Sequence, residues 1–239
     1  MKLDILAFGA HPDDVELGCG GTLAKEIASG RKVGVVDLTR GELGTRGSAE
    51  LRDREAAASS EILRLTVREN MGMRDGFFAN DEEHQRLIIQ VIRKYQPEIV
   101  LCNAVDDRHI DHGRGSKLVS DACFLAGLRK IETFSEDGAA QQEWRPKAVY
   151  HYLQWKNVEP DFVVDITDFI ELKTKAILAY SSQFYDPNSD EPETPIATRN
   201  FLESLHYRAQ DLGRLTGVEF GEGFTVERYP LVNSVFDLR

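Results

Sequence analysis

Short apolar runs alternate with helix-like segments along this chain, and that alternation limits the possible folds more than any other feature. Strand-like runs rich in Val, Ile and Leu occupy residues 3–10, 32–38, 99–102, 148–153 and 162–166, with a weaker run near Val67. Amphipathic segments typical of helices occupy residues 21–29, 48–63, 82–95 and 114–128. Strands joined through helices favour right-handed crossovers into a parallel sheet. The sequence therefore predicts an α/β fold, a Rossmann-like, doubly wound, mostly parallel sheet with helices on both faces.

The chain shows no stretch with the composition of a linker, so we expect residues 1–239 to form one domain. Two polar segments interrupt the regular pattern. Residues 135–143 predict an exposed loop, and residues 185–195, with their three prolines, predict an irregular excursion beside the pocket. A further helix is expected at 197–215 and a short last strand at 224–226.

The charge and cysteine content exclude several classes of partner. The net charge is −11, whereas nucleic acids and anionic membranes are bound by clustered Lys and Arg. No apolar run approaches the ~20 residues of a membrane-spanning helix, and the amino terminus lacks the pattern of a signal peptide. Cys19, Cys102 and Cys123 are an odd number without CxxC spacing, which argues against a disulfide framework. We therefore expect a cytoplasmic protein that binds neither nucleic acid nor membrane.

Two polar clusters directly follow strand-like runs. HPDDVE at residues 11–16 follows the first run, and DRHIDH at residues 107–112 follows the run at 99–102. Open α/β sheets bind their ligands at the carboxyl ends of their strands, so the two clusters are expected to converge. Three-residue spacing lets His11 and Asp14 point to one side of a tight turn and leaves Asp13 as a separate carboxylate.

His11, Asp14 and His112 together form a set of two histidines and one carboxylate. This is the ligand count of a catalytic zinc ion with one position left for water. The same set describes the facial triad of non-haem iron oxygenases, so the ligands alone leave the metal and the reaction open. The glycine-rich residues 18–21 do not have GxGxxG spacing, and the preceding carboxylates would repel a pyrophosphate, which disfavours a dinucleotide site.

These motifs resemble the signature of the LmbE/PIG-L family of zinc-dependent de-N-acetylases. The resemblance rests on AHPDDVE at 10–16, GGT at 20–22 and HIDH at 109–112, and it extends to TRGELG at 39–44. It also includes the helix start at Leu51-Arg52 with Glu55-Ala56. The resemblance implies a metal-dependent amidohydrolase that removes the N-acetyl group of a small N-acetylglucosamine (GlcNAc) conjugate.

The resemblance also implies roles for individual residues. It assigns Zn²⁺ to the three ligands named above and the role of general base to Asp13. His109 is implied as a general acid or oxyanion partner, and Asp111 as a carboxylate that orients an imidazole. His109 as a fourth ligand would instead close the site and make it structural.

For the substrate, the resemblance implies that Glu42 binds sugar hydroxyls and Arg52 an acidic group on the sugar, with Arg145 as a weaker candidate. The details look closest to the bacillithiol-pathway branch, whose members deacetylate N-acetylglucosaminyl malate. Alternatives are a chitooligosaccharide or mycothiol-type precursor as substrate, or less favoured, an iron oxygenase or a catalytically silent sugar-binding protein. Relatives form homo-oligomers, often hexamers, so association of this chain is expected.

Overall fold

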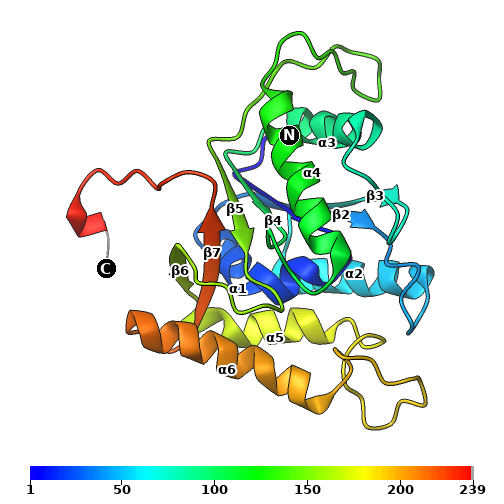
Figure 1. Ribbon diagram of the computed structural model, residues 1–239, viewed down its shortest axis with the longest axis vertical. Helices are drawn as coiled ribbons and strands as arrows, with labels where there is room; N and C mark the ends of the chain where they lie inside the picture. The colour runs from blue at the N-terminus through cyan, green and yellow to red at the C-terminus, as the bar shows by residue number, and fades with distance from the viewer. Residues whose placement is uncertain (238–239) are drawn as a thin grey trace.

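The computed structural model describes residues 1–237, and its centre is a twisted sheet (Figure 1). Within these residues the sheet has seven strands in the order β3-β2-β1-β4-β5-β7-β6. The strands are β1 (Ile5–Gly9), β2 (Val33–Thr39), β3 (Val67–Met73), β4 (Ile99–Cys102), β5 (Ala148–Tyr152), β6 (Phe162–Asp165) and β7 (Gly221–Val226). All pairings are parallel except those of β7, which runs antiparallel to both of its neighbours. The predicted mostly parallel α/β sheet is confirmed.

Helices cover both faces of this sheet. They are α1 (Asp14–Ala28), α2 (Ala49–Leu63), α3 (Glu82–Tyr95), α4 (Ile110–Ala126), α5 (Ile170–Leu178) and α6 (Arg199–Thr216). The pair α3 and α4 packs together on one face, whereas α1, α2 and α5 pack together on the other (Figure 1). Helix α6 lies against β6 and β7 and extends the second layer.

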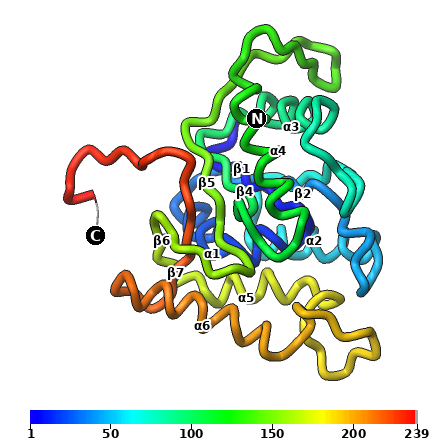
Figure 2. The backbone as a smooth tube through the Cα atoms, in the orientation of Figure 1, coloured from blue at the N-terminus to red at the C-terminus, as the bar shows by residue number. Residues whose placement is uncertain are grey.

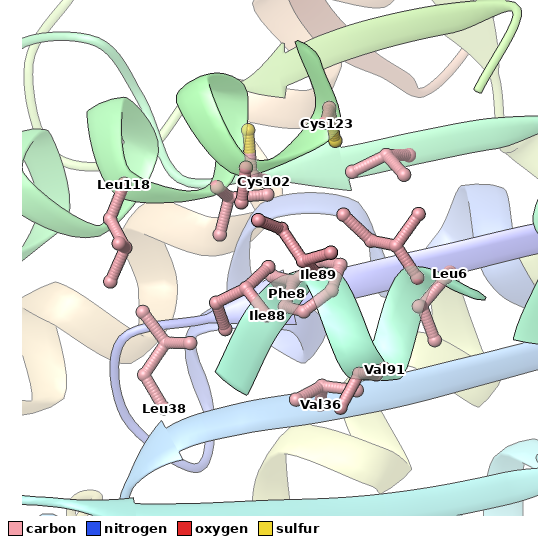
Figure 3. Packing of buried hydrophobic residues seen from close by; sticks show 14 of the residues in the cluster. Leu6, Phe8, Val36, Leu38, Ile88, Ile89, Val91, Cys102, Leu118 and Cys123 are labelled. Carbon is pink, nitrogen blue, oxygen red and sulfur yellow. The ribbon is translucent and has the colours of Figure 1, made fainter. Parts of the chain in front are cut away.

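Successive side chains of the central strands pack alternately into two hydrophobic cores, one on each face of the sheet. Leu6 and Phe8 of β1 pack with Ile88 and Ile89 of α3 (Figure 3), whereas Ala7 belongs to the core beneath α1. A strand that is covered on both faces needs apolar residues at successive positions, which explains the continuous runs in the sequence. The site-bearing ends of β1 and β4 are therefore held by rigid packing on both sides.

Helix α1 begins at Asp14, seven residues before the predicted start at residue 21. The prediction was wrong because glycine is a poor helix former, so the helix was expected to begin only at the last of the glycines at 18–21. In the helix they allow close packing: a Cβ on Gly18 would lie 2.1 Å from the Tyr152 ring, and one on Gly21 would lie 2.8 Å from Ile166. Helix α4 likewise begins at Ile110 rather than 114.

The polar segments lie largely where the sequence predicted them. Residues 135–143 form a loop, and residues 185–195 contain no helix or strand. Helix α5 was not predicted. After β7 the chain leaves the body of the molecule, as the backbone trace in Figure 2 shows. In this segment Tyr229, Leu231 and Phe236 are each at least 90% exposed. Across residues 1–237, no helix combines the length and apolar character that crossing a membrane requires.

Candidate metal centre

The two polar clusters meet at the carboxyl ends of adjacent strands. β1 pairs with β2 on one side and with β4 on the other, so the strand order reverses there. Residues after β1 and after β4 consequently face a common crevice, which is the usual ligand position in open α/β sheets. In it, the ring nitrogens of His11, His109 and His112 lie within 4.8 Å of one another.

The imidazoles of His11 and His112 each have one nitrogen next to an outer carboxylate and the other nitrogen facing Asp14. His11 places Nε2 3.1 Å from Oδ1 of Asp75, and His112 places Nδ1 2.6 Å from Oδ2 of Asp107. The other nitrogen of each ring faces Asp14, at 3.5 Å for His11 and 3.1 Å for His112. Histidines that bind a metal usually donate their second N–H to a carboxylate or carbonyl, which fixes the ring and its tautomer. The donor set of His11, Asp14 and His112 therefore fits a metal ion.

Asp14 is held in place by neutral donors as well. Asn103 Nδ2 donates to its Oδ2 and Gln154 Nε2 donates to its Oδ1, each at 3.0 Å, and the backbone N–H of His11 donates at 2.9 Å. Burial opposes its ionisation, but His112 and His11 keep the pKa of Asp14 well below its usual value. Asp14 is therefore a fixed, ionised carboxylate between two imidazoles.

Asn103, Gln154 and Asp75 were not predicted from the sequence. Asn103 directly follows β4, and Gln154 follows β5 closely, so position at a strand's carboxyl end was the available signal for these two. Asp111, which was predicted to orient an imidazole, lies 3.4 Å from Nε2 of His11. Asp75 is closer to the same nitrogen, and Asp111 is further engaged by Arg114 at 2.7 Å.

Asp13 stands next to this cluster and is paired with Arg52. Arg52 Nη2 donates to Oδ2 of Asp13 at 2.6 Å and to the carbonyl of Pro12 at 2.8 Å. Asp13 has a φ of 113°, a backbone conformation that Asn and Asp tolerate better than most residues. Burial raises the pKa of Asp13 to about 7, even though the neighbouring guanidinium of Arg52 opposes that shift. A carboxylate with such a pKa is suited to accept a proton near neutral pH.

His109 precedes α4 as its N-cap. Its Nδ1 accepts a hydrogen bond from the backbone N–H of Asp111 at 3.3 Å, which places the ring hydrogen on Nε2. Burial and the neighbouring imidazoles of His11 and His112 lower the pKa of His109. The ring is therefore a neutral hydrogen-bond donor in this structure.

The predicted substrate-binding residues are placed differently from one another. Arg52 lines the cavity, but its Nη2 is already engaged by Asp13. Glu42 is exposed, and its Oε1 accepts from the backbone N–H of Asp75 at 2.8 Å, so it supports the Asp75 loop.

Arg145 lies elsewhere. It precedes β5 at the amino end of that strand, donates to the carbonyl of Phe124 at 2.9 Å and stacks over the Phe124 ring. Arg145 is not among the residues that line the cavity, so the structure of this chain gives no support to its expected role in substrate binding.

A cavity of about 430 Å³ joins the cluster to α6. This volume lies in the range of small-molecule sites. One end is lined by the polar residues around His11 and Asp13, and the other by apolar side chains that include Leu17, Leu153 and Leu205. The excursion at 185–195 contributes Thr194 and Pro195 to the wall, as the sequence predicted.

Comparisons with known proteins agree with this geometry. Residues 6–123 match the model of the family PIG-L, GlcNAc-PI de-N-acetylase. Diacetylchitobiose deacetylase of Thermococcus kodakarensis is 30% identical over 229 residues, which cover 92% of this chain and 81% of the relative. The solved structure of a conserved protein from Thermus thermophilus gives a TM-score of 0.85 at 36% identity, covering 96% of this chain and 97% of that chain. N,N′-diacetylchitobiose deacetylase from Pyrococcus horikoshii gives 0.78 at 28% identity, with coverages of 93% and 82%.

Proposed function

This chain belongs to the PIG-L family of GlcNAc-PI de-N-acetylases and is thereby a hydrolytic N-deacetylase, and on that premise we propose that it deacetylates a small GlcNAc conjugate. The observation that carries the proposal is the buried Asp13 beside the cluster of Asp14 with two imidazoles, in one ligand-sized cavity. A free carboxylate next to a metal-binding set supplies both groups that hydrolysis of an amide requires. Neither a sugar-binding protein nor an oxygenase needs that carboxylate.

We propose that the metal is zinc and that His11, Asp14 and His112 hold it. A bound zinc ion would lower the pKa of a water molecule and polarise the acetamide carbonyl. The contacts of Asp75 and Asp107 to the imidazoles support this assignment, because they leave one nitrogen of each ring free to bind the ion.

Asp13 is the proposed general base. It takes a proton from the attacking water as the bond to the acetamide carbon forms, while Arg52 holds the carboxylate in position. Negative charge develops on the former carbonyl oxygen, and His109 is the proposed donor that stabilises it through Nε2–H, since its Nδ1 accepts from the backbone of Asp111. The C–N bond of the acetamide then breaks, acetate is released, and the leaving amine nitrogen receives a proton from Asp13 or His109.

The proposed substrate is N-acetylglucosaminyl malate, as the resemblance to the bacillithiol branch implies. A second candidate is N,N′-diacetylchitobiose, because two of the similar proteins are diacetylchitobiose deacetylases. The test is amine release from both compounds and from plain GlcNAc, using protein stripped of metal and then reloaded with zinc under anaerobic conditions. Zinc-dependent release that favours the malate conjugate supports the proposal. If the protein prefers diacetylchitobiose, that compound becomes the proposed substrate. If zinc-loaded protein releases amine from none of the compounds, the proposed deacetylase activity is refuted.

We further propose that the chain forms a homo-oligomer, with a hexamer as the expected state. The support in this structure is the segment after β7, which exposes Tyr229, Leu231 and Phe236 to solvent. Exposed apolar groups of this kind often mark interaction sites. Light scattering after size-exclusion chromatography measures the state directly, and a monomer at micromolar concentration would contradict the proposal.

A further inference from the structure

Helix α6 forms one wall of the cavity with a mostly apolar face. Phe201, Leu205, Arg208 and Leu212 lie three or four positions apart, so they share one side of the helix, and all four line the cavity. The single charged group on this face is Arg208, which is partly buried. A guanidinium among apolar neighbours is unusual unless it has an anionic partner.

Among residues 1–237, no hydrogen bond or ion pair is formed to the guanidinium of Arg208. Burial lowers the pKa of Arg208, yet a guanidinium remains charged at any pH at which the protein is folded. The Asp107 carboxylate opposes this shift without a hydrogen bond to Arg208 and is itself bonded to His112, so the cost of desolvating the charge is only partly offset within the described part of the chain.

The other cations of the cavity are already engaged. Arg52 is bound to Asp13 as described, and Lys173 Nζ lies 2.6 Å from Oε1 of Glu222. Arg108 stacks on the Trp155 ring at 4.5 Å and is exposed, so water can solvate its charge, unlike that of Arg208. An acidic substrate group bound to Arg52, as the family resemblance implies, would compete there with Asp13. Arg208 offers the free positive charge instead. The cavity thus combines an apolar wall with one guanidinium that has no hydrogen-bond partner among the described residues.

We propose that Arg208 binds a carboxylate on the group attached to the amino sugar, so that this cavity selects anionic GlcNAc conjugates over neutral ones. The inference rests on the proposed function, which places the acetamide at the histidine cluster. Arginine suits this role because its planar guanidinium donates two parallel hydrogen bonds to a carboxylate. Arg208 is accordingly a specificity-determining residue that acts away from the reacting atoms.

The test compares Arg208→Gln and Arg208→Lys with wild type on N-acetylglucosaminyl malate and on neutral methyl N-acetylglucosaminide. For Arg208→Gln we expect KM for the malate conjugate to rise tenfold to a hundredfold, equivalent to about 1.4–2.8 kcal/mol. The kcat for that substrate and both constants for the neutral one stay near wild type, and Arg208→Lys recovers part of the loss. The control is Arg214→Gln, because Arg214 lies on the same helix but is exposed and paired with Asp211. This variant should leave KM and kcat unchanged for both substrates.

Two results overturn the inference. One is an equal loss on both substrates, which would mean a structural role for Arg208, and the other is an unchanged KM for the malate conjugate in Arg208→Gln. If wild type deacetylates neither substrate, the proposed function fails, and calorimetric titration of N-acetylglucosaminyl malate then decides the inference separately. Tighter binding to wild type than to Arg208→Gln supports the anion site, and equal or absent binding refutes it.

Discussion

Removing Arg52 should show whether its main role is to hold Asp13 rather than substrate. The perturbation is a double-mutant cycle with Arg52→Met, Asp13→Asn and the double variant, measured as the free energy of unfolding in urea. Asparagine keeps the tolerance of residue 13 for its positive φ, and methionine keeps much of the volume of the arginine stem. The cycle isolates the interaction of the two side chains from the separate effects of each substitution.

The magnitude follows from the geometry of the pair. Coulomb's law at an effective dielectric constant of about 20 gives roughly 6 kcal/mol for unit charges 2.6 Å apart, before desolvation is subtracted. Both side chains are at least nine-tenths buried, and the pKa of Asp13 is already about 7, so on loss of Arg52 the carboxyl group can take up a proton. Arg52→Met should therefore cost about 1–3 kcal/mol, the cost of a buried polar group without its partner. The double variant removes both charges and should be more stable than the two single losses summed, with a coupling of about 1.5–3 kcal/mol.

The matched control is the pair of Arg40 with Asp53, which is also close, at 2.5 Å, but lies at the surface. Its cycle should give no resolvable coupling, because water screens exposed pairs. Additive losses in the cycle of Arg52 with Asp13 would refute the account of a structural partnership. They would return Arg52 to the role of a substrate-binding residue that merely lies near Asp13.

The remaining predictions concern residues that position the side chains of the site. Gln154→Met removes a donor to Asp14, so zinc affinity measured by competition with a chromophoric chelator should fall at least about tenfold, and unchanged affinity would contradict this. Gly41→Ala should both destabilise the fold and lower activity, because its Cβ would lie 2.0 Å from Nη1 of Arg52 at a φ of +62°. The control is Gly30→Ala, where φ is +87° and the space around the new Cβ is open. It should lower the free energy of unfolding by only about 1–2 kcal/mol, the cost of a left-handed backbone conformation, and leave activity intact. Equal effects of the two substitutions would refute the steric explanation.

The sequence predicted those parts of the site that occur as compact motifs after strands. His11, Asp14 and His112 follow β1 and β4, and the alternation of strands and helices predicts that the carboxyl ends of these parallel strands lie on one side of the sheet. The adjacency of the two strands is seen only in the fold. Asp75 and Gln154 come from loops after β3 and β5 as single polar residues, and no spacing pattern distinguishes them from surface residues. Only the fold shows which imidazole or carboxylate they contact.

Arg145 and Arg208 show two further limits of prediction from the sequence. Arg145 precedes a strand, and the amino end of a strand lies away from the ligand crevice, so its placement could have been questioned from the topology alone. Arg208 lies in a helix whose apolar face is plain in the sequence, but nothing there reveals that the face borders a cavity. The start of α1 was missed because glycine is a poor helix former, and the packing against Tyr152 that compensates for it is a tertiary contact.

Asp13 is proposed as the base of a metal-dependent deacetylation and not as a ligand of the metal. The most direct measurement is bound zinc per chain together with acetate release for wild type and Asp13→Asn, each loaded with zinc under the same conditions. We expect equal zinc content and a loss of turnover of at least about a hundredfold, the usual contribution of a positioned general base. Near-normal turnover in the zinc-loaded variant, or loss of the zinc itself, would contradict the role assigned to Asp13.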